Sequence, residues 1–321
     1  MNELVLHSPL HRLKVHIIPQ WGANIRRLQW QDRQNNWIDL LDGYCHENEL
    51  IEQLYFKNSK LSPFANRVAQ GRYTFDNISY QLPIDKQAAP HALHGFVWAM
   101  PFEVIAQHHS NADNWAILQA TYKPFDFRAN AQLYDLMPQL HKGYPFAFTL
   151  NMAYKISKNG FSCHTQLHNI GNHNLPYVDG WHPYFKLQLP SIDACYLQLP
   201  PVKQLLCDPC LIPNGEIAAF EAYHDLQAIG NTAFDTSFLI KPQSNKSRCE
   251  TVLYNLQHKQ KITLWQNEAY GYLQLYTPPH RQSIAIEPMS AAPDAFNNQM
   301  GLGIVPPKQT WQGKYGVFVS D

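Results

Sequence analysis

Glu287 stands at the end of a short alternating segment, SIAIEPM, at residues 283–289. Small or polar residues alternate there with Ile284 and Ile286, which predicts a strand whose last member is a carboxylate. We expect Pro288 to end that strand, because proline has no N–H for the ladder. Desolvation raises the proton affinity of such a carboxylate, so Glu287 is a candidate general base. The alternative is a strand-end glutamate in a surface ion pair.

Two histidines are candidates for proton transfer to or from the same ligand. His182 lies between Trp181 and a proline in the aromatic segment GWHPYF, where burial and a nearby acid would set its pKa. His94 precedes Gly95, a residue whose backbone freedom often serves to aim a neighbouring side chain into a cleft. The alternative for each is a packed or exposed histidine without a chemical role.

Three further side chains are suited to holding a polar ligand. Arg67 follows Asn66 just before a predicted hairpin, and its guanidinium offers a rigid fork of donors. Asp235 lies in an apolar run between two phenylalanines, where an acid is either a satisfied buried group or a ligand contact. An ordinary surface arginine is the alternative for Arg67.

Charge and composition narrow the class of partner. The 321 residues contain 25 Lys and Arg against 25 Asp and Glu, so there is no basic excess for a nucleic acid or an anionic membrane. Aromatic residues make up 13% of the chain, which suits both a sheet-rich core and a pocket that stacks on sugar rings. No apolar run reaches the roughly 20 residues of a membrane helix, so we expect a soluble, cytoplasmic protein with a small-molecule ligand.

The six cysteines are too scattered for a disulfide framework and fit reduced thiols. Cys207 and Cys210 have CxxC spacing, but no second such motif completes a zinc site. We therefore expect them to be ordinary loop cysteines and predict no metal site.

The elements that must position these residues are strands. Alternating apolar residues predict a long strand from Phe146 to Ile156, and Asn159-Gly160 predicts a tight turn into a return strand. Residues 264–279, LWQNEAYGYLQLYTPP, are also expected to form a hairpin, leading into the strand of Glu287. Consecutive long antiparallel strands favour an all-β sandwich. No linker or internal repeat interrupts the chain, which predicts a single domain over residues 1–321.

These segments together resemble the aldose 1-epimerase (galactose mutarotase) family, in the family's order and over most of the chain. The matching segments are PFANRVAQGRYTFDNISYQLP, ALHGF, GWHPYF, FDTSF and IAIEPMSAAPDAFN. The resemblance implies a large antiparallel β-sandwich of the galactose mutarotase-like supersandwich type. It also implies a mutarotase that needs no cofactor or metal and interconverts the α and β anomers of a free aldohexose such as galactose or glucose.

Residue by residue, the resemblance makes Glu287 the base that takes the proton of the C1 hydroxyl and His182 the acid that protonates the ring oxygen. It places His94 near the ring oxygen as a second histidine. It assigns the sugar hydroxyls to Arg67 and Asp235, with Asn66 as a further member of the binding set.

Two alternatives remain open from the sequence. A hexose-phosphate mutarotase would need several Lys or Arg near the pocket, and the matching segments supply only Arg67 and Arg72. A non-catalytic carbohydrate-binding protein would follow if Glu287 and His182 did not face each other. GWHPYF is the form found in more divergent bacterial relatives, so the resemblance leaves the sugar open, and the sequence leaves the oligomeric state open.

Overall fold

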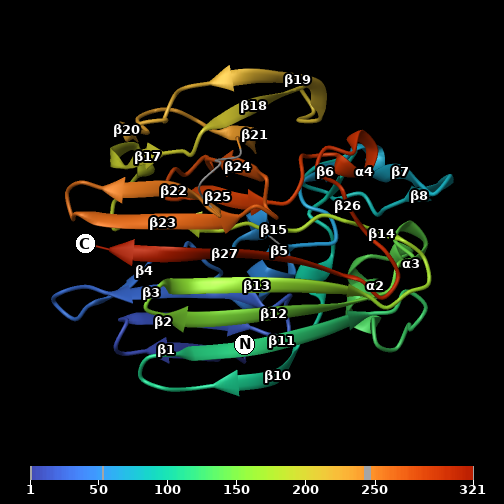
Figure 1. Ribbon diagram of the computed structural model, residues 1–321, viewed down its shortest axis with the longest axis horizontal. Coiled ribbons are helices and arrows are strands. Elements are labelled where there is room, and N and C mark those ends of the chain that lie inside the picture. The colour runs from blue at the N-terminus through green and yellow to red at the C-terminus, as the bar shows by residue number, and fades with distance from the viewer. Residues whose placement is uncertain (1, 53, 242–246, 321) are drawn as a thin grey trace.

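The computed structural model describes residues 2–52, 54–241 and 247–320. Antiparallel strands dominate it, and they stack in layers with short helices confined to the connections (Figure 1). The predicted all-β antiparallel sandwich is therefore confirmed.

The largest sheet contains nine strands of the described residues and forms one face of the molecule in Figure 1. In spatial order it runs β10 (Glu103–His108), β11 (Asn114–Tyr122), β12 (Phe148–Ser157), β13 (Gly160–Asn169), β27 (Thr310–Ser320), β23 (Gln260–Asn267), β22 (Arg248–Asn255), β17 (Tyr196–Gln198) and β20 (Gln227–Ala228). The predicted long strand and its return strand are β12 and β13, joined at Gly160 as expected.

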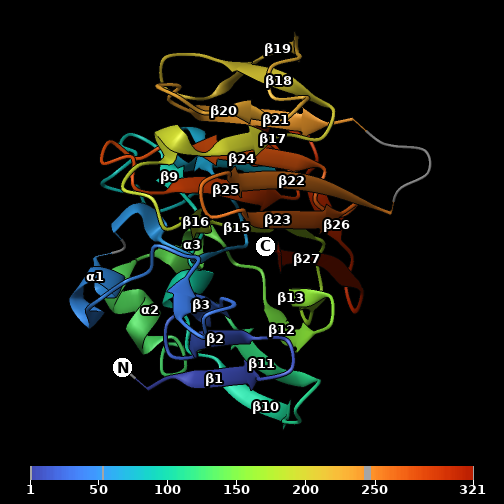
Figure 2. The ribbon, with the colours of Figure 1, turned by 90° about the vertical axis from the view of Figure 1, so that its left-hand side faces the viewer.

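The second large sheet positions the candidate site. It runs β19 (Pro213–Phe220), β18 (Val202–Cys207), β21 (Asp235–Ile240), β24 (Tyr272–Tyr276), β25 (Ile284–Met289), β15 (Gly180–Trp181) and β5 (Lys60–Leu61), with β16 (Tyr184–Phe185) also paired to β25. Its middle strands β24 and β25 follow each other in the chain, whereas β15, which pairs with β25, comes from about a hundred residues earlier. Figure 2 shows β24 and β25 side by side.

Smaller sheets and helices complete the described chain. An N-terminal sheet is formed by β1 (Leu4–Ser8), β2 (Leu13–Ile18), β3 (Asn24–Gln31) and β4 (Trp37–Asp39). Short pairs are formed by β6 (Arg67–Val68) with β9 (Ala92–Leu93), β7 (Arg72–Phe75) with β8 (Ile78–Gln81), and β14 (Leu175–Tyr177) with β26 (Gly303–Val305). The α-helices are α1 (Glu47–Ile51), α2 (Ala131–Leu136), α3 (Leu140–Gly143) and α4 (Ala295–Asn298), and the 3₁₀ turns are η1 (Leu54–Phe56), η2 (Ala69–Gly71), η3 (Val97–Ala99) and η4 (Ile192–Ala194).

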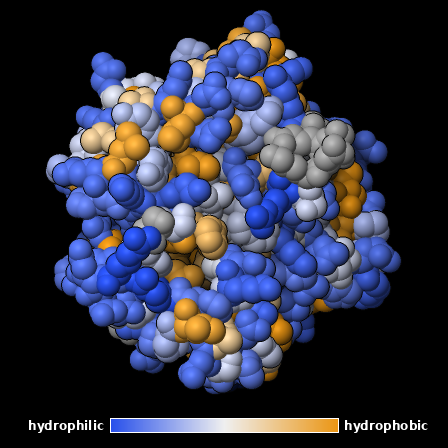
Figure 3. Space-filling view, turned by 60° about the vertical axis from the view of Figure 1, so that its left-hand side comes forward, coloured by the Kyte–Doolittle hydropathy of each residue, from blue (hydrophilic) through white to orange (hydrophobic). Residues whose placement is uncertain are grey.

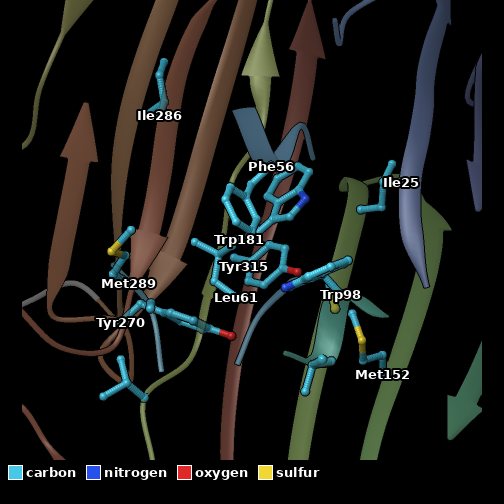
Figure 4. Close-up of a cluster of buried hydrophobic side chains, with 14 of the residues drawn as sticks. Ile25, Phe56, Leu61, Trp98, Met152, Trp181, Tyr270, Ile286, Met289 and Tyr315 are labelled. Carbon is cyan, nitrogen blue, oxygen red and sulfur yellow. The ribbon is translucent and has the colours of Figure 1, made fainter. Parts of the chain in front are cut away.

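The core lies between the layers because each long strand buries alternate side chains. In β12, Phe148, Leu150 and Met152 are buried and the residues between them are half-buried. Aromatic rings fill the space behind the second sheet: Trp181 stacks on Tyr315 with ring centroids 5.0 Å apart (Figure 4). This packing backs the strands that carry the candidate site.

The hairpin predicted at residues 264–279 is wrong. Strand β23 pairs with β22 and β27 in the nine-stranded sheet, whereas β24 pairs with β21 and β25 in the other large sheet. The connection carries the chain from one layer to the next, and the Gln266 amide holds it by donating to the carbonyls of Tyr270 and Tyr272 at 2.7 and 2.8 Å. Local alternation cannot distinguish a hairpin from a crossing between layers.

The expectation that Pro288 ends its strand is also wrong. Strand β25 continues to Met289, and Pro288 pairs with Leu273 of β24. On its other side, β15 and β16 are interrupted between Trp181 and Tyr184. The ladder is therefore already broken beside Pro288, where a missing N–H is tolerated.

Figure 3 shows a mainly hydrophilic face on which hydrophobic residues form small, separate groups. In the part of the chain that the structure describes, no helix is both long and apolar enough to cross a membrane. None of the six cysteines, all of which belong to the described residues, forms a disulfide; Cys207 is half-buried and Cys210 is exposed.

Candidate active site

The register of the second sheet places His182 opposite Glu287. Strand β15 pairs with β25 at Gly180 and Met289, and β16 continues against β25 in the same antiparallel register. His182 falls in the gap between these two short strands, so it faces Glu287 across the sheet. Nε2 of His182 lies 3.5 Å from Oε1 of Glu287, and both side chains are almost completely buried.

Neighbouring strands extend this pair into a polar floor. Gln274 of β24 lies opposite Glu287, and Ser237 of β21 lies opposite Gln274. Two residues further along, on the same face, Asp235 lies opposite Tyr276. Asp235, Gln274 and Tyr276 therefore present an acid, an amide and a phenol beside Glu287, on one face of the sheet.

His94 is held over this floor by a reciprocal pair of hydrogen bonds with Asn66. The His94 N–H donates to the Asn66 carbonyl, and the Asn66 N–H donates to Nδ1 of His94, both at 3.1 Å. Gly95 has φ of +70°, and a Cβ there would lie 2.2 Å from the Ser62 carbonyl oxygen. Because Nδ1 accepts, the proton of neutral His94 is on Nε2. The His94 and His182 ring centroids are 5.1 Å apart.

Arg67 enters the site from β6, beside Asn66. Oδ1 of Asn66 accepts from the Arg67 backbone N–H at 2.8 Å and from its guanidinium at 3.3 Å. Asp294 holds the same segment, since its N–H donates to the Arg67 carbonyl at 2.7 Å and its carboxylate accepts from the Ala69 N–H at 2.8 Å. Arg67 therefore reaches the site from an anchored backbone.

These elements enclose a cavity of about 230 Å³. The structure brings all six predicted site residues to its wall. The lining residues are Tyr55, Phe56, Asn66, Arg67, Gln87, Leu93, His94, His182, Tyr184, Asp235, Gln274, Tyr276 and Glu287.

Sequence reasoning missed several of these residues, of which Gln274 is the most closely tied to the predicted set. Its amide donates to Asp235 at 2.9 Å, and its carbonyl oxygen accepts from the Ser237 hydroxyl. A polar residue between two leucines, in YLQLY, was the available signal. Tyr184 was also missed; it follows His182 by two residues, and the two rings stack at 4.9 Å.

An aromatic edge of the cavity comes from a backbone segment in an unusual conformation. Tyr55, Phe56 and Asn58 have φ of +57°, +50° and +57°, although none is glycine. The Tyr184 hydroxyl donates to the Tyr55 carbonyl at 3.0 Å, and the Phe56 ring packs edge-on against His94 at 4.8 Å. Such strained segments persist where surrounding contacts hold them, often at ligand sites.

Burial governs the protonation of the central groups. It raises the pKa of Glu287 well above its usual value; the Asp235 charge raises it further, while Arg67 opposes this. Burial also lowers the pKa of His182 to about 3. Both shifts favour the neutral forms. In these neutral forms the Glu287–His182 pair holds one proton, and we expect the two groups to titrate as a coupled unit.

Burial also shifts the pKa values of the two flanking groups, His94 and Asp235, toward their neutral forms. Burial lowers the pKa of His94 well below its usual value, with smaller contributions from His182 and Arg67. Burial raises the pKa of Asp235, while Arg67 and the Gln274 amide lower it. His94 is therefore a neutral donor. Across residues 2–52, 54–241 and 247–320, no group of three or more His, Cys, Asp or Glu is arranged to hold a metal ion.

Comparison of the sequence with known protein families identifies the family of this chain. The model of the aldose 1-epimerase family matches residues 4–317. The chain belongs to the aldose 1-epimerase family. The family is one of isomerases acting on sugars, and the residues predicted from its motifs line one cavity here.

Curated relatives within the family are distant. The uncharacterized protein YihR of Escherichia coli is 27% identical over 247 residues, covering 75% of this chain and 72% of its own. The galactose mutarotase of Rattus norvegicus is 27% identical over 256 residues, covering 75% of this chain and 68% of its own. These identities support the family and leave the substrate of this member open.

Solved structures share the fold at low identity. A galactose mutarotase-like protein from Clostridium acetobutylicum superposes with a TM-score of 0.82 at 16% identity, covering 97% of this chain and 93% of its own. An aldose epimerase homologue from C. elegans gives 0.81 at 14% identity, covering 99% and 98%. The fold is thus that of the galactose mutarotase-like proteins.

We expect the Asp235→Asn variant to shift the pH profile of any reaction that uses the Glu287–His182 pair. We expect such a reaction to need the single-proton form of the pair, which is lost at high pH when Glu287 gives up its proton. The Asp235 charge raises the pKa of Glu287, so its removal moves the alkaline limb to lower pH. The measurement is kcat/KM against pH.

Arg67→Gln is the matched variant, for which we expect a shift of the pH profile in the opposite direction. Arg67 lowers the pKa of Glu287, so its loss should move the alkaline limb to higher pH. Shifts of both variants in the same direction would contradict this electrostatic account of the site.

Proposed function

We propose that the protein is a mutarotase that interconverts the α and β anomers of a free aldohexose. The observation that carries the proposal is the facing pair of Glu287 and His182, 3.5 Å apart at the floor of a small cavity. Anomer exchange needs a base at the C1 hydroxyl and an acid at the ring oxygen, two atoms bonded to the same carbon. A carboxyl and an imidazole held this close can reach both.

The proton balance follows from the pair's single proton. Transfer of that proton from Glu287 to His182 gives a carboxylate facing an imidazolium. The carboxylate takes the O1–H proton as the C1–O5 bond breaks, and the imidazolium gives its proton to O5. The pair is then neutral again, which is the form that burial favours. Rotation about C1–C2 and reversal of the transfers give the other anomer.

The remaining residues bind and orient the sugar. Neutral His94 donates from Nε2 toward the ring oxygen, since its Nδ1 is already bonded to Asn66. Arg67 and Asp235 hold sugar hydroxyls, which change little during ring opening. Loss of such contacts raises KM more than it lowers kcat. Asn66 acts in this set mainly by holding the Arg67 guanidinium.

The lining of the cavity favours an uncharged sugar over a sugar phosphate. Among the described residues that line it, Arg67 is the only Lys or Arg, and the acids Asp235 and Glu287 lie beside it. A phosphate dianion would meet these two acids with a single guanidinium to balance its charge. The hexose-phosphate mutarotase is therefore the second candidate.

The test is to follow anomer interconversion by polarimetry or NMR with freshly dissolved pure anomers of galactose, glucose and their 6-phosphates. We expect acceleration with the free aldohexoses. Faster turnover of the phosphates would favour the second candidate. Saturable sugar binding without acceleration of any anomer would identify a non-catalytic carbohydrate-binding protein and contradict the proposal.

A further inference from the structure

A buried ion pair lies next to the candidate site and is not part of its lining. Lys60 and Asp179 form this pair with side chains 1% and 0% exposed. Tyr177 and Tyr270 donate their hydroxyls to Asp179 at 2.5 and 2.6 Å. Lys60 also donates to the Thr165 hydroxyl at 2.9 Å. The carboxylate is thus satisfied by three side chains.

The backbone of Asp179 is tied to the strand that carries Glu287. The Asp179 N–H donates to the Ser290 hydroxyl, and the Ser290 N–H donates to the Asp179 carbonyl, both at 2.8 Å. Asp179 lies three residues before His182, and Ser290 lies three residues after Glu287. The two pairs therefore belong to the same antiparallel register, three steps apart.

Lys60 holds the other side of the His182 segment. It lies opposite Trp181 in the pairing of β5 with β15. The adjacent Ser59 carbonyl accepts from the His182 N–H at 3.1 Å, and the Asn58 N–H donates to the His182 carbonyl at 2.9 Å. The ion pair thus connects the backbone on both sides of His182.

Stability alone does not account for such a pair. The desolvation of two buried charges offsets much of their attraction, and well-packed apolar residues in their place are often as stable or more stable. We propose that Asp179 is a positioning residue, which acts with Lys60 and Ser290 to fix His182 against Glu287. Its kinetic consequence rests on the proposed mutarotase function.

The kinetic test compares Ser290→Ala and Asp179→Asn with two controls. Misplacement of catalytic groups by about 1 Å can lower a rate by as much as 10²-fold. We expect kcat to fall by about tenfold or more in both variants, with KM nearly unchanged because Arg67 and Asp235 are untouched. Ser290→Thr keeps the hydroxyl and should keep kcat. Thr165→Val removes a bond to Lys60 from the other sheet and should also keep kcat.

A second readout does not depend on catalysis. In ¹⁵N-histidine-labelled protein, the His182 ring signals are assigned by their loss in His182→Asn. We expect these signals to shift in Ser290→Ala and Asp179→Asn and to stay unchanged in Thr165→Val. Absence of anomer exchange in the wild-type protein would overturn the proposed function and leave this test intact. Unchanged His182 signals in folded Ser290→Ala and Asp179→Asn would overturn the positioning role.

Discussion

Replacement of Glu287 with glutamine is expected to lower kcat for anomer exchange by about 10²- to 10⁴-fold, the usual contribution of a general acid or base. The amide has the shape of the carboxyl group, so the packing in β25 should be retained. It cannot take a proton from the C1 hydroxyl, and it cannot share one with His182, which lies 3.5 Å away. The measurement is polarimetric kcat and KM on a free aldohexose.

The control for this variant is Glu268→Gln, at an exposed glutamate that does not line the cavity. It should retain wild-type kcat. Circular dichroism and the melting temperature report folding of both variants. Near-normal turnover in a folded Glu287→Gln protein would mean that another group is the base, and the proposed mechanism would then be wrong.

Replacement of His182 with asparagine is expected to lower kcat by about 10²-fold or more, with a smaller effect on KM. The variant keeps a polar side chain but loses the acid that protonates the ring oxygen. The substitution also removes one of the two groups that titrate together, so the pH profile should become that of Glu287 alone. Kinetics across a pH series measure both effects.

His168→Asn is the matched histidine control. His168 lies on β13, on the exposed face of the large sheet, where its Nδ1 forms a hydrogen bond of 3.0 Å with the Thr310 hydroxyl. Its loss should leave kcat and the pH profile unchanged. A His182→Asn protein with wild-type kcat and altered KM would place His182 among the binding residues instead.

Local patterns were enough to predict much of the fold. The alternation of apolar residues predicted β12, and Asn159-Gly160 predicted its turn into β13. Both predictions were possible because each signal is contained in a short stretch of the sequence. The crossing between β23 and β24 could not be found in this way, since each strand is paired with partners far away in the sequence. The single domain and the cytoplasmic location stay predictions.

The candidate site, too, could be predicted from the sequence only in part. Motif order supplied the six residues, but their proximity depends on a register that no local pattern contains. His182 and Glu287 meet because β15, β16 and β25 pair in one continuous alignment. Gln274 was missed because its importance depends on which residues lie opposite it, Glu287 on one side and Ser237 on the other.

The shared register of residues 179–185 and 284–290 limits how this chain can change in length. Side chains alternate between the two faces of a strand, so a deletion or insertion of one residue within either segment would turn His182 or Glu287 away from the cavity. Substitutions at neighbouring positions keep that alternation. Length changes should therefore be confined to the connections outside these two segments, whereas replacements inside them keep the register and should be tolerated at positions other than Asp179, His182, Glu287 and Ser290.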